Sequence, residues 1–147
     1  MSPRWLHWPA AVSAGQFWQV DALCGTKAGN DAEMALSSIV ETGETANFNA
    51  YAFGPVRRSL TNTFIEFMIS IQSGGAYSNA ADFLSATSLR SYSVSVDGIE
   101  LVATSVTEVD ATSLLRIRFN NTSSTVIDDF WNDLDLGDSF VFRMEYQ

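Results

Sequence analysis

The sequence predicts a mainly β protein: an antiparallel β-sandwich, Ig-like or jelly-roll-like, with two short helices and an extended N-terminal arm. Apolar and polar residues alternate with a period of two over Tyr92–Ala103 and Leu115–Phe119, as in strands with one buried face. Asp97-Gly98 interrupts the first run, and Asp-Gly is a strong hairpin signal because a type I′ turn needs positive φ at both central residues. We therefore expect a meander of three antiparallel strands over Tyr92–Phe119, with Glu108–Thr112 as a polar break.

One domain is expected behind a short arm. At 147 residues, with 46% hydrophobic content, the chain has room for a single ordinary core. We expect residues 1–14 to form the arm, because Pro3 and Pro9 prevent a helix through them. Residues 15–147 are expected to form a single β-sandwich domain, since no linker, repeat or low-complexity segment divides them.

Several strands are expected before the meander. Thr63–Gln72 is almost continuously apolar, which is typical of a central strand buried on both faces. Met34–Thr42 fits either a strand or a helix, and Cys24–Asp31 is expected to be a loop because it contains two glycines. The other expected elements in this half are the strands Phe17–Val20 and Asn47–Phe53 and the turn at Gly54-Pro55.

Two short helices and a last strand complete the predicted fold. Asn79–Ser88 is expected to be a helix capped by Asn79 or Ser78. Val126–Leu134 is expected to be a second helix, capped by Ser124 or Thr125. Its inward-facing residues are expected to be Ile127, Phe130, Trp131 and Leu134. Asp138–Tyr146 alternates and is the expected last strand. A smaller α+β sheet is the alternative architecture.

Composition excludes several function classes. The formal net charge is −9 and Lys27 is the only lysine, so binding to nucleic acid or to an anionic membrane is not expected. Cys24 is the only cysteine, which rules out an internal disulfide. No apolar run is long enough for a transmembrane helix, and prolines interrupt the apolar start, so we expect no signal peptide and synthesis in the cytoplasm.

The residues needed for catalysis are scarce. His7 is the only histidine, and it lies in the arm between two tryptophans, so we expect no enzyme and no cofactor. Asp133, Asp135 and Asp138 superficially resemble part of a calcium loop, which leaves Ca²⁺ as a weak possibility. A glycosidase pair such as Glu66 with Glu100 has almost no support, because any β domain carries glutamates on its strands.

The end of the chain resembles a known class of repeat. The runs SVSVDG and GDSFVFRMEY resemble Ig-like repeats of bacterial surface and phage tail proteins. The resemblance covers only Tyr92–Tyr146, and this chain departs from the pattern by inserting the expected helix Val126–Leu134. The resemblance implies a β fold.

The expected function is that of a structural subunit. We expect a non-enzymatic bacteriophage virion protein, a head decoration (cement) or tail component, located in the virion and bound to other copies of itself and to other virion proteins. The arm is expected to dock through Trp5, Leu6 and Trp8, since tryptophan is enriched at interface hot spots. Arg57 and Arg58 are candidates to pair with the acidic segment 128–138 of a neighbour. Head or tail location, copy number and symmetry stay open.

Two alternatives remain from the sequence alone. The arm's tryptophans equally suit a plug at the edge of the domain's own core. The chain could also be a carbohydrate-binding or adhesion module of a surface or tail-fibre protein, with a sugar platform formed by exposed aromatic residues. The candidates for that platform are Trp18, Tyr51, Tyr77 and Tyr92.

Overall fold

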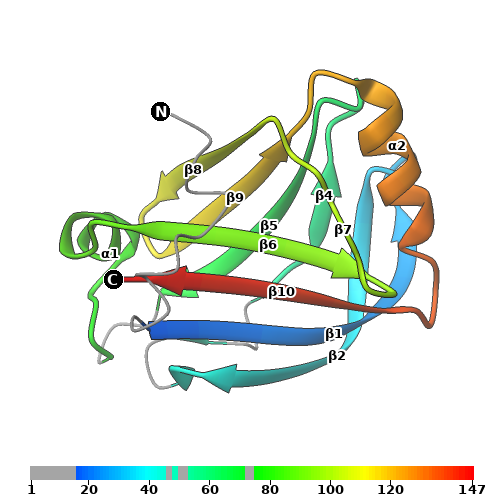
Figure 1. Ribbon diagram of the computed structural model, residues 1–147. Coiled ribbons are helices and arrows are strands. Elements are labelled where there is room, and N and C mark those ends of the chain that lie inside the picture. The colour runs from blue at the N-terminus through cyan, green and yellow to red at the C-terminus, as the bar shows by residue number, and fades with distance from the viewer. Residues whose placement is uncertain (1–15, 46–47, 50–52, 72–74) are drawn as a thin grey trace.

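The computed structural model describes residues 16–45, 48–49, 53–71 and 75–147. Within these ranges the chain forms ten strands and two helices, shown in Figure 1. In chain order they are β1 (Gln16–Ala28), β2 (Glu33–Gly43), β3 (Phe48–Asn49), β4 (Val56–Arg58), β5 (Phe64–Ile71), α1 (Ala80–Ala86), β6 (Arg90–Val96), β7 (Ile99–Glu100), β8 (Ser105–Ala111), β9 (Leu114–Asn120), α2 (Ser124–Asp133) and β10 (Ser139–Tyr146).

The described strands all belong to one antiparallel sheet that curls on itself into a half-barrel (Figure 1). Its order is β7-β6-β10-β1-β2-β4-β5-β9-β8, with β3 paired to β5. The prediction of a mainly β protein with two short helices is confirmed. The finer prediction of an Ig-like or jelly-roll-like sandwich is not confirmed, because hydrogen bonds join the strands into a single continuous sheet.

The first hairpin is longer than the sequence pattern indicated. β1 continues through Cys24 to Ala28, so the predicted loop Cys24–Asp31 is wrong over most of its length. The pairing of β1 with β2 shifts register on both sides of Cys24, and such bulges bend a strand and increase its twist. Gly25 is required at this bend, because a Cβ there would lie 2.8 Å from the carbonyl oxygen of Ala35. Met34–Thr42, left open between strand and helix, lies in β2.

The predicted meander is only half correct. Asp97 and Gly98 both have positive φ and join β6 to β7 in an antiparallel hairpin, as predicted. However, the expected polar break Glu108–Thr112 lies largely within β8, which pairs with β9 through a turn at Thr112. β7 ends after two residues, and the chain then crosses to the opposite edge of the sheet. Alternation identified the strands but carried no information about their partners.

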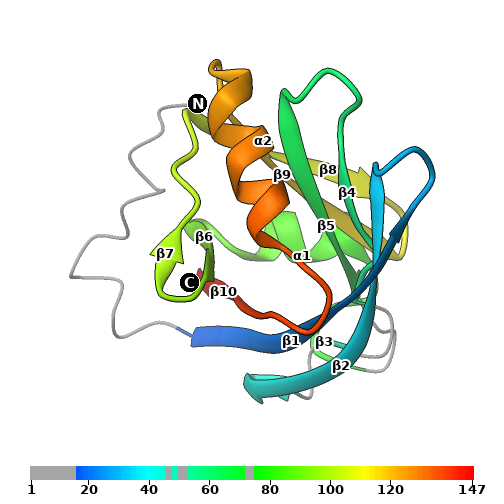
Figure 2. The ribbon, with the colours of Figure 1, turned by 90° about the vertical axis from the view of Figure 1, so that its right-hand side faces the viewer.

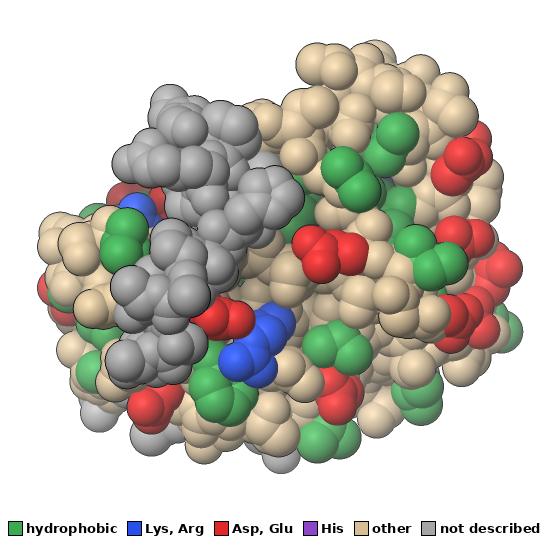
Figure 3. Space-filling model, viewed as in Figure 1, with side chains coloured by type: hydrophobic (Ala, Val, Ile, Leu, Met, Phe, Trp, Pro, Cys, Tyr) green, Lys and Arg blue, Asp and Glu red, His purple; other side chains and the backbone are tan. Residues whose placement is uncertain are grey.

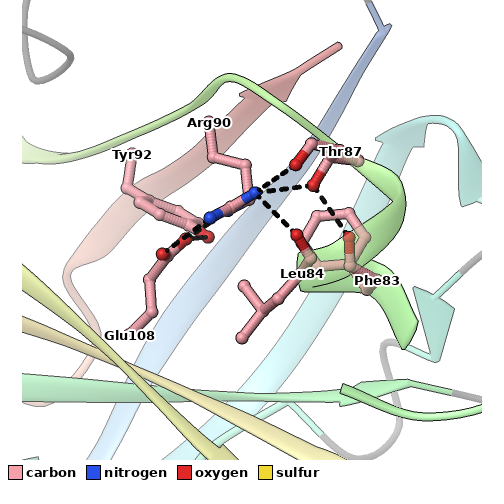
Figure 4. A network of polar contacts seen from close by, with 6 residues as sticks. All are labelled: Phe83, Leu84, Thr87, Arg90, Tyr92 and Glu108. Atoms are coloured by element: carbon pink, nitrogen blue, oxygen red, sulfur yellow. Dashed lines mark hydrogen bonds and ion pairs between the residues drawn. The ribbon is translucent and has the colours of Figure 1, made fainter. Parts of the chain in front are cut away.

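Side chains join the start of β6, beyond the two residues that β7 covers, to the edge strand β8, and we call this contact the seam (Figure 4). Arg90 on β6 donates from Nε to Glu108 Oε2 on β8 at 2.5 Å and from Nη2 to Oε1 at 3.0 Å. The Tyr92 hydroxyl donates to the same Oε2 at 2.5 Å. Arg90 Nη1 also donates to the carbonyls of Leu84 and Thr87, so the end of α1 is tied to the seam.

Aromatic side chains fill the inner side of the curled sheet. The ring centroid of Phe142 on β10 lies 5.3 Å from those of Phe53 and Phe67 and 6.3 Å from that of Trp18. Many of these rings meet edge to face, the arrangement that aromatic quadrupoles favour. The largest fully buried aromatic residues are Trp18, Phe48, Phe67, Phe83, Phe119, Trp131, Phe140, Phe142 and Tyr146. The inner side of the sheet is therefore a packed core.

Both predicted helices are present. α1 is capped by Asn79, whose side-chain oxygen accepts a hydrogen bond from the Asp82 amide at 2.8 Å, as predicted. The N-cap of α2 is Ser123 and not Ser124 or Thr125, and its side chain makes no capping hydrogen bond. The Asn121 side chain accepts from the Ser123 amide at 2.8 Å. The four residues expected to face inward on α2 are all buried, which confirms that prediction.

Helix α2 lies across the open end of the curled sheet, between β7 and the β4–β5 side (Figure 2). Its Trp131 is fully buried and anchors it there. Lys27 Nζ donates to the Trp131 carbonyl at 2.8 Å and lies 5.0 Å from the ring centroid, while Arg58 lies 5.7 Å from the ring centroid. Two cations on one indole hold the helix against β1 and β4.

Candidate interaction surface

A shallow hollow lies between β7 and α2, and we call it the β7–α2 groove. Its volume is about 240 Å³. Apolar side chains dominate its lining, and three carboxylates complete it. The lining residues are Ile99, Glu100, Leu101, Val102, Val126, Asp129, Phe130 and Asp133. Among the described residues, those that line the groove include acidic side chains and no cation.

One face of α2 forms the first wall of the groove. Val126, Asp129, Phe130 and Asp133 are spaced three and four residues apart, so they share one side of the helix. The opposite side carries Trp131, which is directed into the core. Helical spacing therefore places two apolar and two acidic side chains toward β7 while the helix stays anchored.

The second wall is the segment Ile99–Thr104, which hydrogen bonds hold in place. The Leu101 amide donates to the Val94 carbonyl at 2.9 Å, and the Leu101 side chain is buried. Asn121 Nδ2 donates to the Val102 carbonyl at 2.7 Å, which ties this wall to the start of α2. Contacts within the chain therefore hold both walls of the groove in place.

Two residues of the groove lining are exposed apolar side chains: Ile99 and Val102 are 65% and 69% exposed. Leu136, just beyond α2 and outside the lining, is 71% exposed. Figure 3 shows hydrophobic and acidic side chains side by side over the right-hand part of the molecule, where Figure 1 places β7 and α2. Such a surface suits a ligand that combines bulky apolar groups with positive charge.

The predicted interface residues divide into two groups. Trp5, Leu6 and Trp8, like His7, lie outside the described residues. Arg57 and Arg58 lie on β4 and bind acidic residues of their own chain. Arg57 Nε lies 2.8 Å from Glu33 Oε2, and Arg58 Nη2 lies 3.7 Å from Asp31 Oδ2. The Arg58 side chain is only 12% exposed, so of the two arginines Arg57 is the more accessible. Their pairing with the segment 128–138 of a neighbour stays a prediction.

The three aspartates considered for calcium do not converge. Asp133 faces the β7–α2 groove, whereas Asp135 lies 3.8 Å from Lys27 Nζ. Between residues 16 and 147, in the described ranges, no three His, Cys, Asp or Glu residues are grouped so as to hold a metal ion. Asp133 is the last residue of α2, whereas Asp135 and Asp138 lie beyond the helix, so helical spacing does not bring the three carboxylates together.

Glu66 and Glu100 do not form a catalytic pair. Glu66 lies on β5, is 3% exposed and accepts from Arg118 Nε at 2.8 Å. Glu100 lies on β7, at one edge of the sheet, with five strands between the two in the sheet order. Glu66 serves as the partner of Arg118, and Glu100 belongs to the rim of the groove.

The predicted sugar platform is not formed. Trp18 and Tyr92 are buried among the core aromatic residues, which is the more usual place for such side chains. Tyr77 is half-buried against Phe83, with ring centroids 5.0 Å apart. Tyr51 lies outside the described residues. Trp18 and Tyr92 point inward because each lies on the face of its strand that lines the core.

Cys24 is fully buried at the bend of β1, beneath the connection from α2 to β10. Its amide donates to the Asp138 carbonyl at 2.8 Å and its carbonyl accepts from the Gly137 amide at 3.0 Å. Burial chiefly, and the negative charge of Asp138 next, raise the pKa of the thiol from 9.0 to about 11. The thiol is therefore a protonated core group at neutral pH, with little nucleophilic character.

Cys24→Ala is expected to lessen the loss of stability in alkaline solution. Folding raises the pKa of the thiol, so the protonated thiol contributes fully to the free energy of unfolding below pH 9.0. This contribution is lost as the pH rises to about 11. A shift of this size corresponds to about 3 kcal/mol in the free energy of unfolding. Urea unfolding of both proteins across this pH range measures the difference. Parallel curves of unfolding free energy against pH would contradict the prediction.

Sequence reasoning did not identify the β7–α2 groove, although two signals for it exist. Leu101-Val102-Ala103 breaks the alternation of the hairpin, so at least one apolar side chain had to face solvent. On α2, Val126 lies beside Asp129 at helical spacing, outside the inward-facing stripe. Neither signal could show that the two segments lie next to each other.

Comparisons with protein-family models, with curated proteins and with solved structures found no match for this chain. In the part of the chain that the structure describes, neither helix is long and apolar enough to cross a membrane. The function proposed below therefore depends on the geometry of the surface and on the sequence of the arm.

Proposed function

We propose that this chain is a non-enzymatic structural subunit of a large assembly, of the kind found in bacteriophage virions as head decoration or tail proteins. The observation that carries the proposal is the β7–α2 groove, an exposed apolar hollow with fixed walls and an acidic rim. Apolar side chains gathered at one place on a surface are typical of protein-binding sites. The packed aromatic core behind it suits a rigid building block.

The N-terminal arm supplies the second support. Trp5, Leu6 and Trp8 are large apolar residues that precede the first strand, and tryptophan contributes more than most residues to protein interfaces. A subunit that carries both an apolar groove and a tryptophan-rich arm can join identical copies with a single type of contact.

Replacing the two arm tryptophans is expected to weaken self-association. In a Trp5→Ser/Trp8→Ser variant of the full chain, each lost indole is expected to raise the dissociation constant about 30-fold, since truncated hot-spot residues cost about 2 kcal/mol each. Sedimentation velocity and native mass spectrometry over a range of protein concentrations measure the change. Removal of residues 1–12 is expected to have the same effect.

Val40→Ser is the matched control, because Val40 is an exposed apolar residue on β2 away from the groove, with 58% of its surface accessible. This variant is expected to associate as the wild type does, and circular dichroism should be unchanged in all variants. If the wild-type chain and the tryptophan variant have the same mass at every concentration, the proposal is wrong.

A further inference from the structure

We propose that the β7–α2 groove receives residues 4–8 of the arm of a second copy of this chain. This inference depends on the proposed function, which it makes specific by naming the binding site for the arm. It follows from the size of the groove, its charge, and the position of the arm's attachment at the other end of the sheet.

The size of the groove suits side chains better than a small-molecule ligand. Its volume of about 240 Å³ is below the range of about 300–1,000 Å³ that is usual for small-molecule pockets. Its buried parts are the side chains of Leu101 and Phe130, which are 4% and 5% exposed. A bulky apolar residue such as Trp5 or Trp8 would cover this apolar surface and the exposed Ile99 and Val102 around it.

The charge of the groove matches the arm. Asp129 and Asp133 lie four residues apart on one face of α2, and Glu100 lies on the opposite wall. Residues 1–15 contain Arg4 and His7 and no acidic residue, whereas the whole chain has a net charge of −9. The arm is therefore a segment whose positive charge lies next to its apolar residues, and Arg4 can bind carboxylates in a bidentate manner.

The arm is attached at the end of the sheet farthest from the groove. β1 begins at Gln16, which pairs with Tyr146 at the end of β10. Ile99 pairs with Val96, Val96 pairs with Phe140, and Phe140 pairs with Ala22. Ile99 therefore lies level with Ala22 along the strands. The six residue steps from Gln16 to Ala22 cover about 20 Å along β1. Crossing the sheet from β1 through β10 and β6 to β7 adds three strand spacings, about 14 Å.

Reaching its own groove would leave the arm almost no slack. The straight path combining these two displacements is about 24 Å, and it ignores the curvature of the sheet. The eight Cα–Cα steps from Trp8 to Gln16 extend to about 28 Å at most. The arm of a neighbouring copy has no such limit, so exchange of arms between copies satisfies both grooves without a stretched tether.

Charge reversal with rescue tests this contact. The groove-reversed variant is Asp129→Arg/Asp133→Arg, and the arm-reversed variant is Arg4→Asp. Each alone is expected to associate at least about tenfold more weakly than the wild type, because like charges then meet across the groove. In an equimolar mixture both contacts regain opposite charges, so native mass spectrometry is expected to show mixed complexes with affinity close to that of the wild type.

The control variant reverses the same number of aspartate charges at a distance from the groove. Asp21 and Asp110 are exposed on β1 and β8, and Asp21→Arg/Asp110→Arg is expected to associate like the wild type. Thermal unfolding of every variant checks that the fold is retained.

The outcomes separate this inference from the proposed function. If the groove-reversed variant associates normally while the tryptophan variant does not, the arm binds elsewhere and the inference fails while the structural role stands. If each reversed variant is weakened but their mixture is not restored, pairing of the arm with the groove is wrong. If the wild-type chain is monomeric at all concentrations, the proposed function and the inference both fail.

Discussion

Glu108→Ala is expected to lower the free energy of unfolding by about 3 kcal/mol. Glu108 is the partner that Arg90 and Tyr92 share at the seam between β6 and β8. Without it, the Arg90 guanidinium, whose side chain is 18% exposed, stays mostly buried with neutral partners, among them the oxygens of Leu84, Thr87 and Tyr92. Removal of one partner from a buried ion pair costs about 3–5 kcal/mol, and partial exposure here favours the lower end of that range. Urea unfolding monitored by tryptophan fluorescence measures the change.

The matched control is Glu145→Ala on β10. Glu145 Oε2 accepts from Arg143 Nε at 2.9 Å, but the two side chains are 28% and 35% exposed, respectively. Its removal is expected to cost less than about 1 kcal/mol, as is usual for pairs in contact with solvent. The double variant Arg90→Leu/Glu108→Leu is expected to be less destabilised than Glu108→Ala, because no charge is left unpaired. Equal costs for Glu108→Ala and Glu145→Ala would show that the seam contributes no more than a surface pair.

No backbone ladder joins β6 to β8 in the described sheet. The seam links them instead through side chains, with Glu108 accepting from both Arg90 and Tyr92. Burial first, and the charge of Glu108 next, raise the pKa of Tyr92 well above its usual value, so its hydroxyl remains a donor at neutral pH. Because folding raises this pKa, the contribution of Tyr92 to the free energy of unfolding decreases as the pH rises above the usual pKa of tyrosine.

Local sequence signals predicted strands and turns well. Asp97-Gly98, the cap at Asn79 and the buried residues of α2 each depend on neighbours in the chain, and all three were predicted correctly. Global arrangement was not predictable in this way. A period of two specifies which side chains share a face, but not which strand lies beside which, so β8 and β9 were not placed at the opposite edge from β7.

The candidate site illustrates the same limit. Trp5, Leu6 and Trp8 could be proposed as interface residues from the sequence, because their chemistry and spacing are local properties, and this role stays a prediction because they lie outside the described residues. The β7–α2 groove could not, since its walls are 24 or more residues apart in the chain and meet only when α2 crosses the end of the sheet. Arg58 makes a contact of the same long-range kind, because its guanidinium lies over the Trp131 ring.

Phe142→Ala is expected to be among the most destabilising single substitutions in this chain, with a cost of about 4–5 kcal/mol, at the upper end of the range for a buried phenylalanine. Its ring lies at the centre of the core, within 6.3 Å of the ring centroids of Trp18, Tyr92 and Phe119 as well as those of nearer neighbours. The cavity would be lined by aromatic rings, which are too rigid to collapse into it.

A loss of this size is a large part of the usual total stability of about 5–15 kcal/mol, and it should lower the melting temperature by about 8–20 °C. Val141→Ala is the matched control, because Val141 is the preceding residue on β10 and is only half-buried on the other face. It is expected to cost less than about 1 kcal/mol, and Phe142→Leu less than half the cost of Phe142→Ala, since leucine keeps most of the volume. Calorimetry distinguishes these cases. Similar melting temperatures for Phe142→Ala and Val141→Ala would mean that the curled sheet is stabilised by its hydrogen bonds and not by the aromatic core.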